Sequence, residues 1–459
     1  MCDISESIKE MIGMKIEIPA YARTALEKLH AEGFKAYIVG GCVRDSVLGK
    51  KPDDYDICTD CTPDSMKKVF SDFTTIETGI KHGTLTVLID RKPVEITTFR
   101  SDGKYTDHRK PDSVRFETEL AEDLKRRDFT VNALCYNERE GIVDMFGGIS
   151  DIENKIIRCV GKPQERFDED ALRIMRAMRF SSVLGFEIEP NTAAAVHEQK
   201  ELLREISAER IAAELKKLLC GEGAERILLG HRDVMAVIIP QLKPCFDLAQ
   251  NNPHHCYDVY THICKSVGNI QPDWVLRLTM LLHDIGKPLV KKTDENGIDH
   301  FKTHQFRSAE LARQITADLK LDNKSRRRIY DLVYEHDNRI PAAKRSVRRF
   351  LSKYDEEFFA DYMRVRRADT LAQSMYLREE KIEELDELER IAAQIHEESL
   401  CLHLSDLAVN GKDLMTLGYS GSGIGEGLKF LLDAVIEDKV PNSKVDLLEF
   451  IRSHHTTNT

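Results

Sequence analysis

The sequence predicts an α+β chain, in which an N-terminal part of mixed α/β character, with a small antiparallel or mixed sheet, is followed by helices only. Short alternating runs such as TLTVLI and PVEITTF indicate strands within the first third of the chain. From about Gly161 onward these strand signals disappear, and apolar residues recur at helical spacing, as in AERIAAELKKLLCG. Strands followed by a long run of helices favour a sheet-containing N-terminal part and separate helical regions.

The expected elements follow one another along the chain. A helix is expected from Tyr21 to Gly33, then a strand in KAYIVGG, a helix in CVRDSVLG and further strands beginning with DYDICT. The Pro-containing stretch IIPQLKPCFDLAQNNPHH separates the first helices from a His-rich helical segment between about His254 and Gln373. A highly charged helix then leads to a C-terminal helical piece. At roughly 150 residues per domain, 459 residues correspond to about three domains.

Composition narrows the class of protein. Hydrophobic residues make up 41% and charged residues 32%, which is typical of a globular chain and too apolar for a disordered one. The net charge is −11, so a nucleic-acid-binding surface would have to be local. The chain has neither a long apolar run nor a signal-peptide pattern, so we expect no membrane segment. Eleven scattered Cys favour reduced thiols and a cytoplasmic location.

Three acidic residues form a candidate metal site. Asp54 and Asp56 lie in the predicted strand DDYDICT, where i,i+2 spacing places both carboxylates on one face, and Glu95 lies in another strand that could run alongside. Converging carboxylates repel each other, so a cation such as Mg²⁺ is needed, and two such ions can activate a hydroxyl and stabilise a leaving oxygen. The alternative is that Asp54 and Asp56 are solvated turn residues. The preceding Gly40 and Gly41 favour the metal site, since a glycine turn lets N–H groups approach phosphates.

A series of motifs resembles the signature of the class II tRNA nucleotidyltransferases, which include the CCA-adding enzymes and the bacterial poly(A) polymerases. It begins with GGCVRDSVLGKKPDDYDICT and continues in order with VEITTFR, DLKRRDFTVNAL, DMFGGISDI and DEDALRIMRAMRF. The resemblance implies a nucleotidyltransferase head over residues 1–146, a helical neck over 147–245, an HD domain over 246–375 and a helical tail over 376–459. It also implies Mg²⁺-dependent, template-independent addition of C, C and A from CTP and ATP to the 3′ end of tRNA, with release of pyrophosphate.

The resemblance also implies roles for single residues. Asp54 and Asp56 correspond to the metal-binding aspartates, Glu95 corresponds to the third carboxylate, and Gly147 and Gly148 match the hinge between head and neck. The residues implied in nucleotide binding are Gly40, Gly41, Arg44, Asp45, Arg127, Asp128, Asn132, Asp170, Arg173, Arg176 and Arg179.

Asp170 and Arg173 are the candidate residues for base selection. Their i,i+3 spacing predicts one shared helix face, from which a carboxylate and a guanidinium could read the Watson–Crick edge of C or A. The alternative is a surface salt bridge, which is the commoner role of such a pair. Arg176 is expected to face the triphosphate or the RNA end, and Arg179 could equally be structural.

Sequence features also bear on which family member this is. The segment FTTIETGIKHGTLTVLI lacks the basic-aromatic element that marks bacterial poly(A) polymerases. The stretch between Arg100 and Phe116 is similar to the flexible loop of enzymes that complete the whole CCA end. These features favour complete CCA addition, and an A-adding enzyme or a poly(A) polymerase is the alternative.

A second candidate metal site lies in the His-rich segment. His283 and Asp284 in LLHDIGKP resemble the hallmark of HD-type phosphohydrolases, and His262 upstream and Asp369 downstream complete an H…HD…D pattern. Imidazole and carboxylate ligands suit a transition metal. The site implies an ancillary phosphohydrolase activity or, alternatively, a domain retained for tRNA binding. The further candidate ligands are His304 and His336.

A basic stretch is the candidate tRNA-binding surface. Between Lys320 and Arg367 there are 14 Lys or Arg and 8 Asp or Glu, a local balance of +6 in an acidic chain. A charge run is usually only a solvated face. Salt-dependent tRNA binding through this stretch is nevertheless expected, because cationic side chains that neutralise phosphates release counterions. The expected contact residues are Arg326, Arg327 and Arg328.

Overall fold

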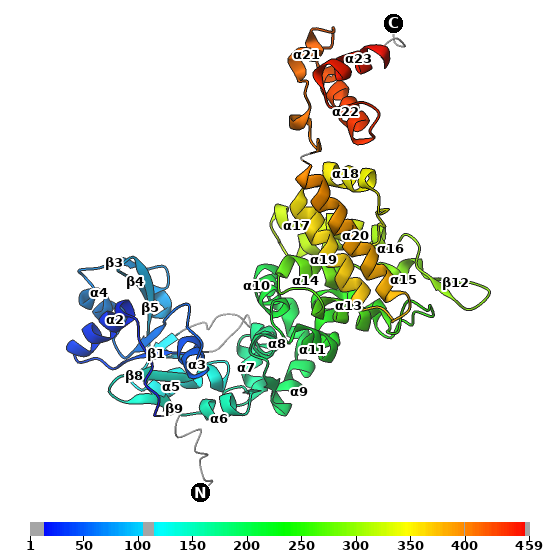
Figure 1. Ribbon diagram of the computed structural model, residues 1–459. Helices are drawn as coiled ribbons and strands as arrows, with labels where there is room; N and C mark the ends of the chain where they lie inside the picture. Colours follow the sequence, from blue (N-terminus) through cyan, green and yellow to red (C-terminus); the bar gives the residue numbers. More distant parts are fainter. Residues whose placement is uncertain (1–12, 104–113, 399, 455–459) are drawn as a thin grey trace. The chain divides into compact units, whose positions relative to one another are not determined.

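The computed structural model describes residues 13–103, 114–398 and 400–454 (Figure 1). The chain divides into two compact units. The first comprises Met1–Lys243 with Asp318–Leu321, and the second comprises Pro244–Ala317 with Asp322–Thr459. The break after Lys243 lies close to the predicted boundary after residue 245, and the further boundaries after residues 146 and 375 stay predictions. In the part of the chain that is described, no helix is long and apolar enough to cross a membrane.

A mixed seven-stranded sheet forms the core of the first unit, in the order β3-β4-β5-β2-β1-β8-β9. β2 and β5 pair in parallel, and every other neighbouring pair is antiparallel. This confirms the predicted α+β class with a mixed sheet. The strands are β1 Ala36–Val39, β2 Ile57–Thr59, β3 Thr74–Ile76, β4 Thr84–Ile89, β5 Lys92–Thr98, β8 Leu134–Asn137 and β9 Gly141–Asp144.

Short helices flank this sheet because apolar residues line one side of each. Helix α2 packs against β1, β4 and β5, and helix α3 packs against β1 and β8. The helices of this region are α2 Ala20–Ala31, α3 Gly41–Val47, α4 Pro63–Val69, α5 Leu120–Lys125 and α6 Gly148–Glu153, with the 3₁₀ turns Ile80–His82 and Thr130–Asn132. A two-stranded ribbon, β6 Arg100–Asp102 with β7 Val114–Phe116, flanks residues 104–113, so most of the predicted flexible loop lies outside the described residues.

The predicted hinge glycines lie at the start of α6. Gly147 has a φ of +78°, a conformation that favours glycine. A Cβ atom at Gly148 would lie only 2.3 Å from the Thr130 carbonyl oxygen. A larger side chain at residue 148 would therefore force α6 away from the turn that contains Thr130. A hinge role for these glycines stays a prediction.

Helix α8 is the centre of the helical half of the first unit. It packs against α7, α10 and α11. A Cβ atom at Gly221 would meet the Ser182 hydroxyl at 2.2 Å, which shows how closely the turn after α10 approaches α8. The helices here are α7 Pro163–Glu169, α8 Leu172–Leu184, α9 Pro190–Glu198, α10 Ala208–Leu219, α11 Ala224–Gly230 and α12 Arg232–Ile238. The remaining elements are the strand pair β10 Ile156–Ile157 and β11 Glu187–Ile188 and the 3₁₀ segments Lys200–Glu205 and Pro240–Cys245.

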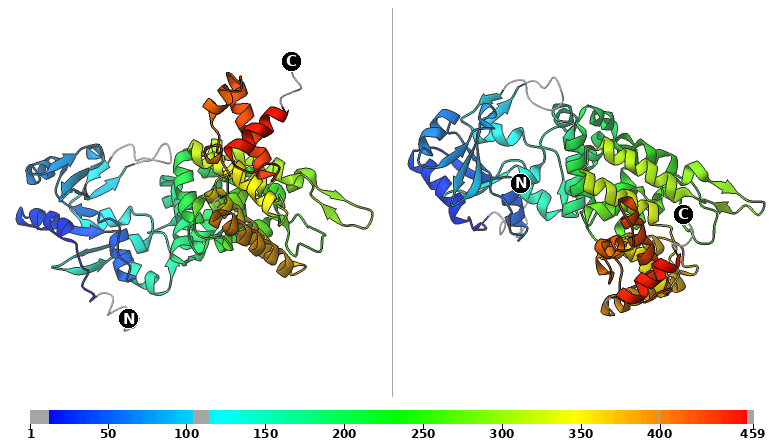
Figure 2. Two further views of the ribbon diagram at one scale, coloured as in Figure 1. Left: turned by 45° about the horizontal axis from the view of Figure 1, so that its top comes forward. Right: turned by 90° about the horizontal axis from the view of Figure 1, so that it is seen from above.

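Helix α14 is the central helix of the second unit. Its residues Leu276–Leu282 are all buried, and it packs against α13, α17 and α19. A helix that is apolar all round belongs in a core, which is why WVLRLTMLL forms this one. The helices are α13 Val259–Gly268, α14 Trp274–Leu282, α15 Lys287–Val290, α16 His304–Asp318, α17 Asn323–Glu335, α18 Lys344–Lys353, α19 Glu356–Leu371 and α20 Arg378–Glu397. The hairpin of β12 Lys292–Thr293 and β13 Asp299–His300 projects from these helices (Figure 2).

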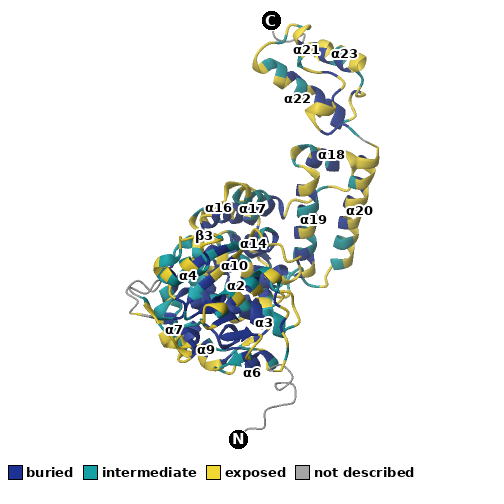
Figure 3. Ribbon diagram, turned by 90° about the vertical axis from the view of Figure 1, so that its left-hand side faces the viewer, coloured by how far each residue is buried: buried dark blue, intermediate teal, exposed yellow. Residues whose placement is uncertain are grey.

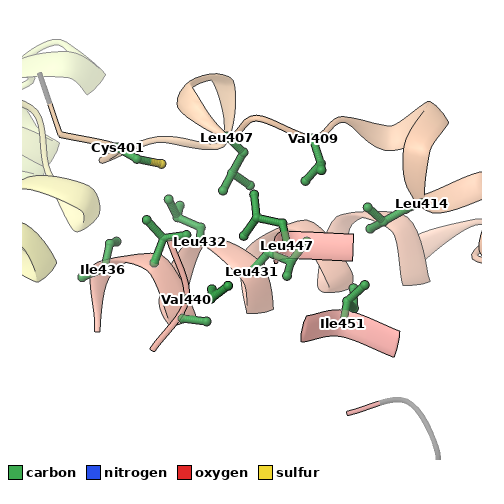
Figure 4. Packing of buried hydrophobic residues seen from close by; sticks show 12 residues of the cluster. Cys401, Leu407, Val409, Leu414, Leu431, Leu432, Ile436, Val440, Leu447 and Ile451 are labelled. Carbon is green, nitrogen blue, oxygen red and sulfur yellow. The ribbon is translucent and has the colours of Figure 1, made fainter. Parts of the chain in front are cut away.

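Helix α20 packs against α18 and α19, and its buried side faces α19 (Figure 3). The predicted tail begins with this helix, and that assignment stays a prediction. The residues from Cys401 onward form a separate hydrophobic cluster. The side chains of Leu407, Leu414, Leu431 and Leu447 are among those that pack together in it (Figure 4). The elements of this part are the 3₁₀ turn Leu404–Asp406 and helices α21 Gly411–Met415, α22 Ser422–Ile436 and α23 Lys444–His454.

Candidate active site and metal centre

The predicted carboxylates of the head lie together because of one strand pairing. Ile57 of β2 is in register with Ile96 of β5, so Asp56, the residue directly before β2, lies next to Glu95 of β5. The prediction that Asp54 and Asp56 lie in a strand is wrong, because β2 begins at Ile57 and both residues belong to the segment that leads into it. Desolvation by the surrounding protein raises the pKa of Asp56, the charges of Asp54 and Glu95 raise it further and Arg127 lowers it, so that it lies at about 6. The structure therefore places three mutually repelling carboxylates at one point of the sheet.

These carboxylates fit a hard divalent cation. In the described part of the chain, no Lys or Arg forms an ion pair with any of the three, so their charge is not neutralised by a close partner. All three residues are exposed, and an incoming ion and phosphate could reach them. All-oxygen donors on an open site are the ligands that Mg²⁺ prefers.

The glycine turn before α3 contacts the RRDFTVNA motif. Gly40 has a φ of +83°, its N–H donates to the Leu134 carbonyl oxygen, and a Cβ atom here would lie 3.3 Å from Nη1 of Arg127. Arg44 is buried and donates to both oxygens of Asp45 at 2.9 Å and, from Nη1, to the Asn132 side chain at 2.5 Å. The predicted phosphate-side residues therefore form one connected group.

Asp128 is buried within a hydrogen-bonded network. Nε of Arg176 donates to Oδ2 of Asp128 at 2.7 Å, and the Asn132 amide donates to Oδ1 at 3.1 Å. Burial on its own would raise the pKa of Asp128, but Arg176 and Asn132 hold it at about 2. Asp128 is therefore ionised at neutral pH and fixes Arg176 against the head.

The predicted helix face shared by Asp170 and Arg173 is wrong. Helix α7 ends at Glu169 and α8 begins at Leu172, so Asp170 lies in extended backbone before α8 and not on a face of it. Its carbonyl oxygen accepts from the Arg173 N–H at 2.9 Å and its side chain from the Leu172 N–H at 3.1 Å. The two side chains do not pair with each other. Nη2 of Arg210 donates to Asp170 at 3.0 Å, and Nη1 of Arg173 donates to Glu169 at 2.6 Å.

Arg179 contacts other protein side chains, as expected for a structural residue. Its guanidinium forms an ion pair with Glu214 of α10 at 2.6 Å and lies 3.8 Å from the centre of the Phe180 ring. Burial lowers the pKa of Arg179 and the charge of Glu214 offsets part of this, so that the pKa lies at about 10. Arg179 therefore joins α8 to α10.

Six side chains of the His-rich segment converge in the second unit, and we refer to them as the histidine cluster. They come from α13, the end of α14, α16, the end of α17 and α19. Two groups within it have ligand atoms close enough for one metal ion, and both include Asp284. The cluster consists of His262, His283, Asp284, His304, His336 and Asp369. The structure therefore brings together the four residues of the H…HD…D pattern and the two further candidates.

The cluster is buried, and its two carboxylates stabilise positive charge on neighbouring side chains. Burial on its own would lower the pKa of His283, but Asp284 and Asp369 raise it to about 10. Nζ of Lys287 lies 2.7 Å from Oδ2 of Asp284 and 2.8 Å from the Gln250 amide oxygen. Lys287 was not predicted as a site residue, although its i,i+3 spacing from Asp284 was a usable signal.

The predicted basic stretch is divided between exposed and paired residues. Arg327 is 84% exposed, whereas Arg328 is mostly buried and pairs with Asp361 at 2.6 Å. Arg326 donates weakly to Asn323 at 3.4 Å. Only part of the triad is therefore available to phosphates, and its contact with tRNA stays a prediction.

Family models match three stretches of the chain. A model described as "Poly A polymerase head domain" matches residues 36–158. A model described as "Probable RNA and SrmB-binding site of polymerase A" matches residues 185–246, and one for tRNA nucleotidyltransferase domain 2 matches residues 300–451. The first match contains the carboxylate site, and the third contains His304, His336 and Asp369.

Curated relatives and solved structures are similar to the chain. The CCA-adding enzyme of Lactiplantibacillus plantarum is 32% identical over 94% of this chain and 95% of that enzyme. The CCA-adding enzyme of Levilactobacillus brevis is 48% identical over 49% of this chain, and that alignment spans 55% of the relative's length. The crystal structure of the Bacillus stearothermophilus CCA-adding enzyme in complex with CTP has a TM-score of 0.71 and 29% identity and covers 99% of both chains.

Proposed function

The chain belongs to the family of CCA-adding enzymes, and we propose that it adds C, C and A from CTP and ATP to the 3′ end of tRNA and releases pyrophosphate. The observation that supports this most directly is the register of β2 and β5, which brings Asp56 next to Glu95 on an exposed face of the sheet. Enzymes of this family use divalent metal ions, and we propose Mg²⁺ for this one.

We propose different roles in the reaction for different residues of the head. Asp54, Asp56 and Glu95 would hold Mg²⁺, which when bound supplies positive charge to the triphosphate and makes the attacking hydroxyl more acidic. The tRNA 3′-oxygen attacks the α-phosphorus, the bond from that phosphorus to the bridging oxygen breaks, and pyrophosphate leaves. Gly40 lets the backbone approach the phosphates closely, and positioning and charge stabilisation provide most of the rate.

Asp170 and Arg173 are proposed to select the base. Each already has a protein partner, Arg210 and Glu169 respectively. Reading the Watson–Crick edge of C or A would exchange these ion pairs for hydrogen bonds to the base. Asp170→Asn should then relax the choice of nucleotide, whereas Asp168→Asn, a change of the same kind two residues earlier, should not.

One experiment tests the transfer reaction and its alternatives. The protein is incubated with tRNA that ends at the discriminator base, labelled CTP and ATP, and Mg²⁺, and the products are sequenced. A CCA end supports the proposal. A run of A residues would indicate a poly(A) polymerase, and extension only of a tRNA that already ends in CC would indicate an A-adding enzyme. We also propose a cytoplasmic location, which the free thiols of the described Cys residues support.

A second candidate activity is proposed for the histidine cluster, namely hydrolysis of phosphate esters with a bound transition metal. Four imidazoles and two carboxylates converging in a buried site support it, because nitrogen and oxygen donors of this kind suit such metals. Purified protein should open a 2′,3′-cyclic nucleotide in a metal-dependent reaction. No hydrolysis with any divalent metal would contradict this activity and leave the transfer reaction unaffected.

A further inference from the structure

Asp123 of α5 is a buried carboxylate in the head that was not predicted as a site residue. None of its surface is exposed. Burial on its own would raise the pKa of Asp123, but the charges of Arg127 and Arg126 hold it below its ordinary value. Asp123 is therefore ionised at neutral pH. A buried carboxylate in this form is stable only when hydrogen-bond donors surround it.

The two oxygens of Asp123 accept from different donors. Nε and Nη2 of Arg126 donate to Oδ1 at 3.0 and 2.7 Å, and the Arg100 N–H donates weakly to the same oxygen at 3.4 Å. Oδ2 accepts from Nη2 of Arg127 at 3.2 Å. Arg100 begins β6, just after the end of β5, the strand that carries Glu95. Asp123 therefore joins the end of that strand to Arg127.

Arg126 and Arg127 use this carboxylate in different ways. Arg126 directs Nε and Nη2 at one oxygen, so that edge of its guanidinium is satisfied. Arg127 gives Nη2 only. Among the described residues, its Nη1 has no hydrogen-bond partner, and its buried Nε has none either. A buried donor without a partner costs free energy, so these two nitrogens are best explained by a ligand that binds there.

The unpaired part of Arg127 lies against the glycine turn before α3. Nη1 is 3.3 Å from the position that a Cβ atom would take at Gly40. The N–H of Val39, the residue before this glycine, donates to the Asp56 carbonyl oxygen at 2.9 Å. The free nitrogens of Arg127 therefore lie beside the turn that is proposed to approach the phosphates, next to a proposed metal ligand.

We propose that Asp123 is a positioning residue of the transfer reaction, which holds Arg127 by Nη2 so that Nη1 and Nε meet the triphosphate of the incoming nucleotide. This inference rests on the proposed transfer reaction and on the proposed nucleotide-binding role of Arg127, and it adds the residue that orients this side chain. A guanidinium that is already held on one side loses little freedom when it binds a phosphate, so its affinity is higher.

The alternative is that Asp123 only neutralises two mostly buried guanidinium groups. The two roles differ in what they predict for nucleotide binding. A positioning role affects CTP and ATP by the same factor, because the phosphates are common to both, whereas Asp170 and Arg173 are proposed to distinguish the bases. A purely structural role changes stability and leaves the affinity of the folded protein for either nucleotide unchanged.

Equilibrium binding of CTP and of ATP to the full-length protein, with Mg²⁺ and without tRNA, tests the proposal. Asp123→Asn keeps the shape of the side chain and removes its charge. It should weaken the binding of both nucleotides by about tenfold, as expected when a charge-assisted hydrogen bond to phosphate is poorly made. Glu122→Gln changes the exposed neighbour in α5 and is the matched control, which should bind like the unmodified protein. Unchanged affinity in folded Asp123→Asn would overturn the proposal.

A double-mutant cycle shows whether Asp123 acts through Arg127. Arg127→Gln should weaken CTP binding by about thirtyfold, and adding Asp123→Asn to it should cause no further loss. Losses that multiply would mean that the two residues act independently and would overturn the proposal. Arg127→Lys keeps a cation for Asp123 and so preserves the buried pair, but it has no second nitrogen to reach the turn. It should lose nearly as much affinity as Arg127→Gln, and full affinity would overturn the proposal.

Arg126→Gln separates charge balance from positioning. It removes two hydrogen bonds of Asp123 and leaves the one with Arg127. The thermal midpoint should fall, while CTP affinity should stay within about twofold of that of the unmodified protein. A loss of affinity as large as that of Asp123→Asn would mean that charge balance is the cause and would overturn the proposal. An unmodified protein that binds neither CTP nor ATP would instead contradict the proposed function.

Discussion

The head carboxylates and the histidine cluster are the two sites at which we propose metal binding, and they are built from different donors in different surroundings. Asp54 and Asp56, directly before β2, and Glu95 of β5 are exposed and carry only oxygen donors. The histidine cluster is almost entirely buried, mixes nitrogen with oxygen donors and has every imidazole held by a backbone carbonyl.

The difference indicates how long an ion stays. An exposed site without a second layer of contacts suits a hard ion that arrives with each nucleotide and leaves with pyrophosphate. A buried site with fixed ring orientations suits ions that remain bound and contribute to stability. The raised pKa of Asp56, about 6, agrees with a head site whose negative charge is neutralised only when a cation binds.

The largest effect is expected at the head. Asp56→Asn should lower the rate of CMP incorporation by about 10³-fold or more, because several kcal/mol of charge stabilisation in the transition state are lost with the ion. The metal content of the histidine cluster should not change. Asp53→Asn, an exposed neighbour, is the control and should retain activity. Equal activity of both variants would remove the metal role of Asp56.

The ion pair between the buried Asp128 and Arg176 of α8 should affect stability rather than metal binding. Asp128→Asn leaves the partly exposed Arg176 without its carboxylate and should lower the free energy of unfolding by about 2 kcal/mol, measured by urea denaturation. A loss below about 1 kcal/mol would mean that Arg176 finds another partner such as Glu214.

The pH dependence of this pair has a definite sign. The folded-state pKa of Asp128, about 2, lies below its ordinary 3.8, so its stabilisation is fully present above about pH 4 and is lost as the pH falls through about 2. The shift corresponds to about 2 kcal/mol. Acid unfolding of Asp128→Asn should therefore be less steep between about pH 4 and pH 2 than that of the unmodified protein.

Metal removal should lower the stability of the region that contains the histidine cluster. Trp274, the single Trp of the chain, begins α14, whose end carries His283, so its fluorescence reports on the second unit. Chelation should destabilise this unit by about 2–3 kcal/mol, the stabilisation expected from a ligand present at about a hundred times its Kd, and Mn²⁺ should restore it. A thermal midpoint that does not respond to chelator or metal would argue against resident ions.

The smallest effects are expected on the basic stretch. Arg327→Gln should weaken tRNA binding a few-fold and reduce the salt dependence by about one unit of slope, without loss of stability, because Arg327 is exposed. Arg328→Gln should instead destabilise the fold by about 1 kcal/mol, because Arg328 pairs with Asp361. If the salt dependence of tRNA binding is unchanged in Arg327→Gln, this stretch is a solvated face and does not contact tRNA.

Some features followed from local sequence because they depend on short-range pattern. The alternation in TLTVLI predicted β4, in which Leu85, Val87 and Ile89 are buried. Motif order alone identified the family, which the alignment with the Lactiplantibacillus plantarum enzyme shows. The break between α7 and α8 was missed because the apolar spacing of DEDALRIMRAMRF continues through it, and the ion pairs of Asp170 with Arg210 and of Arg173 with Glu169 were missed with it.

The sequence by itself determined the α+β class, the family and the candidate ligands, because strand alternation, helical spacing and short motifs are local properties of a chain. Only the tertiary structure decided which of these residues meet. The parallel pairing of β2 with β5 joins Asp56 to Glu95 across 39 residues of sequence. The packing of five helices brings the two oxygens of Asp284 to separate imidazole pairs. Contacts between distant segments depend on the register and packing of whole elements, which no local pattern encodes.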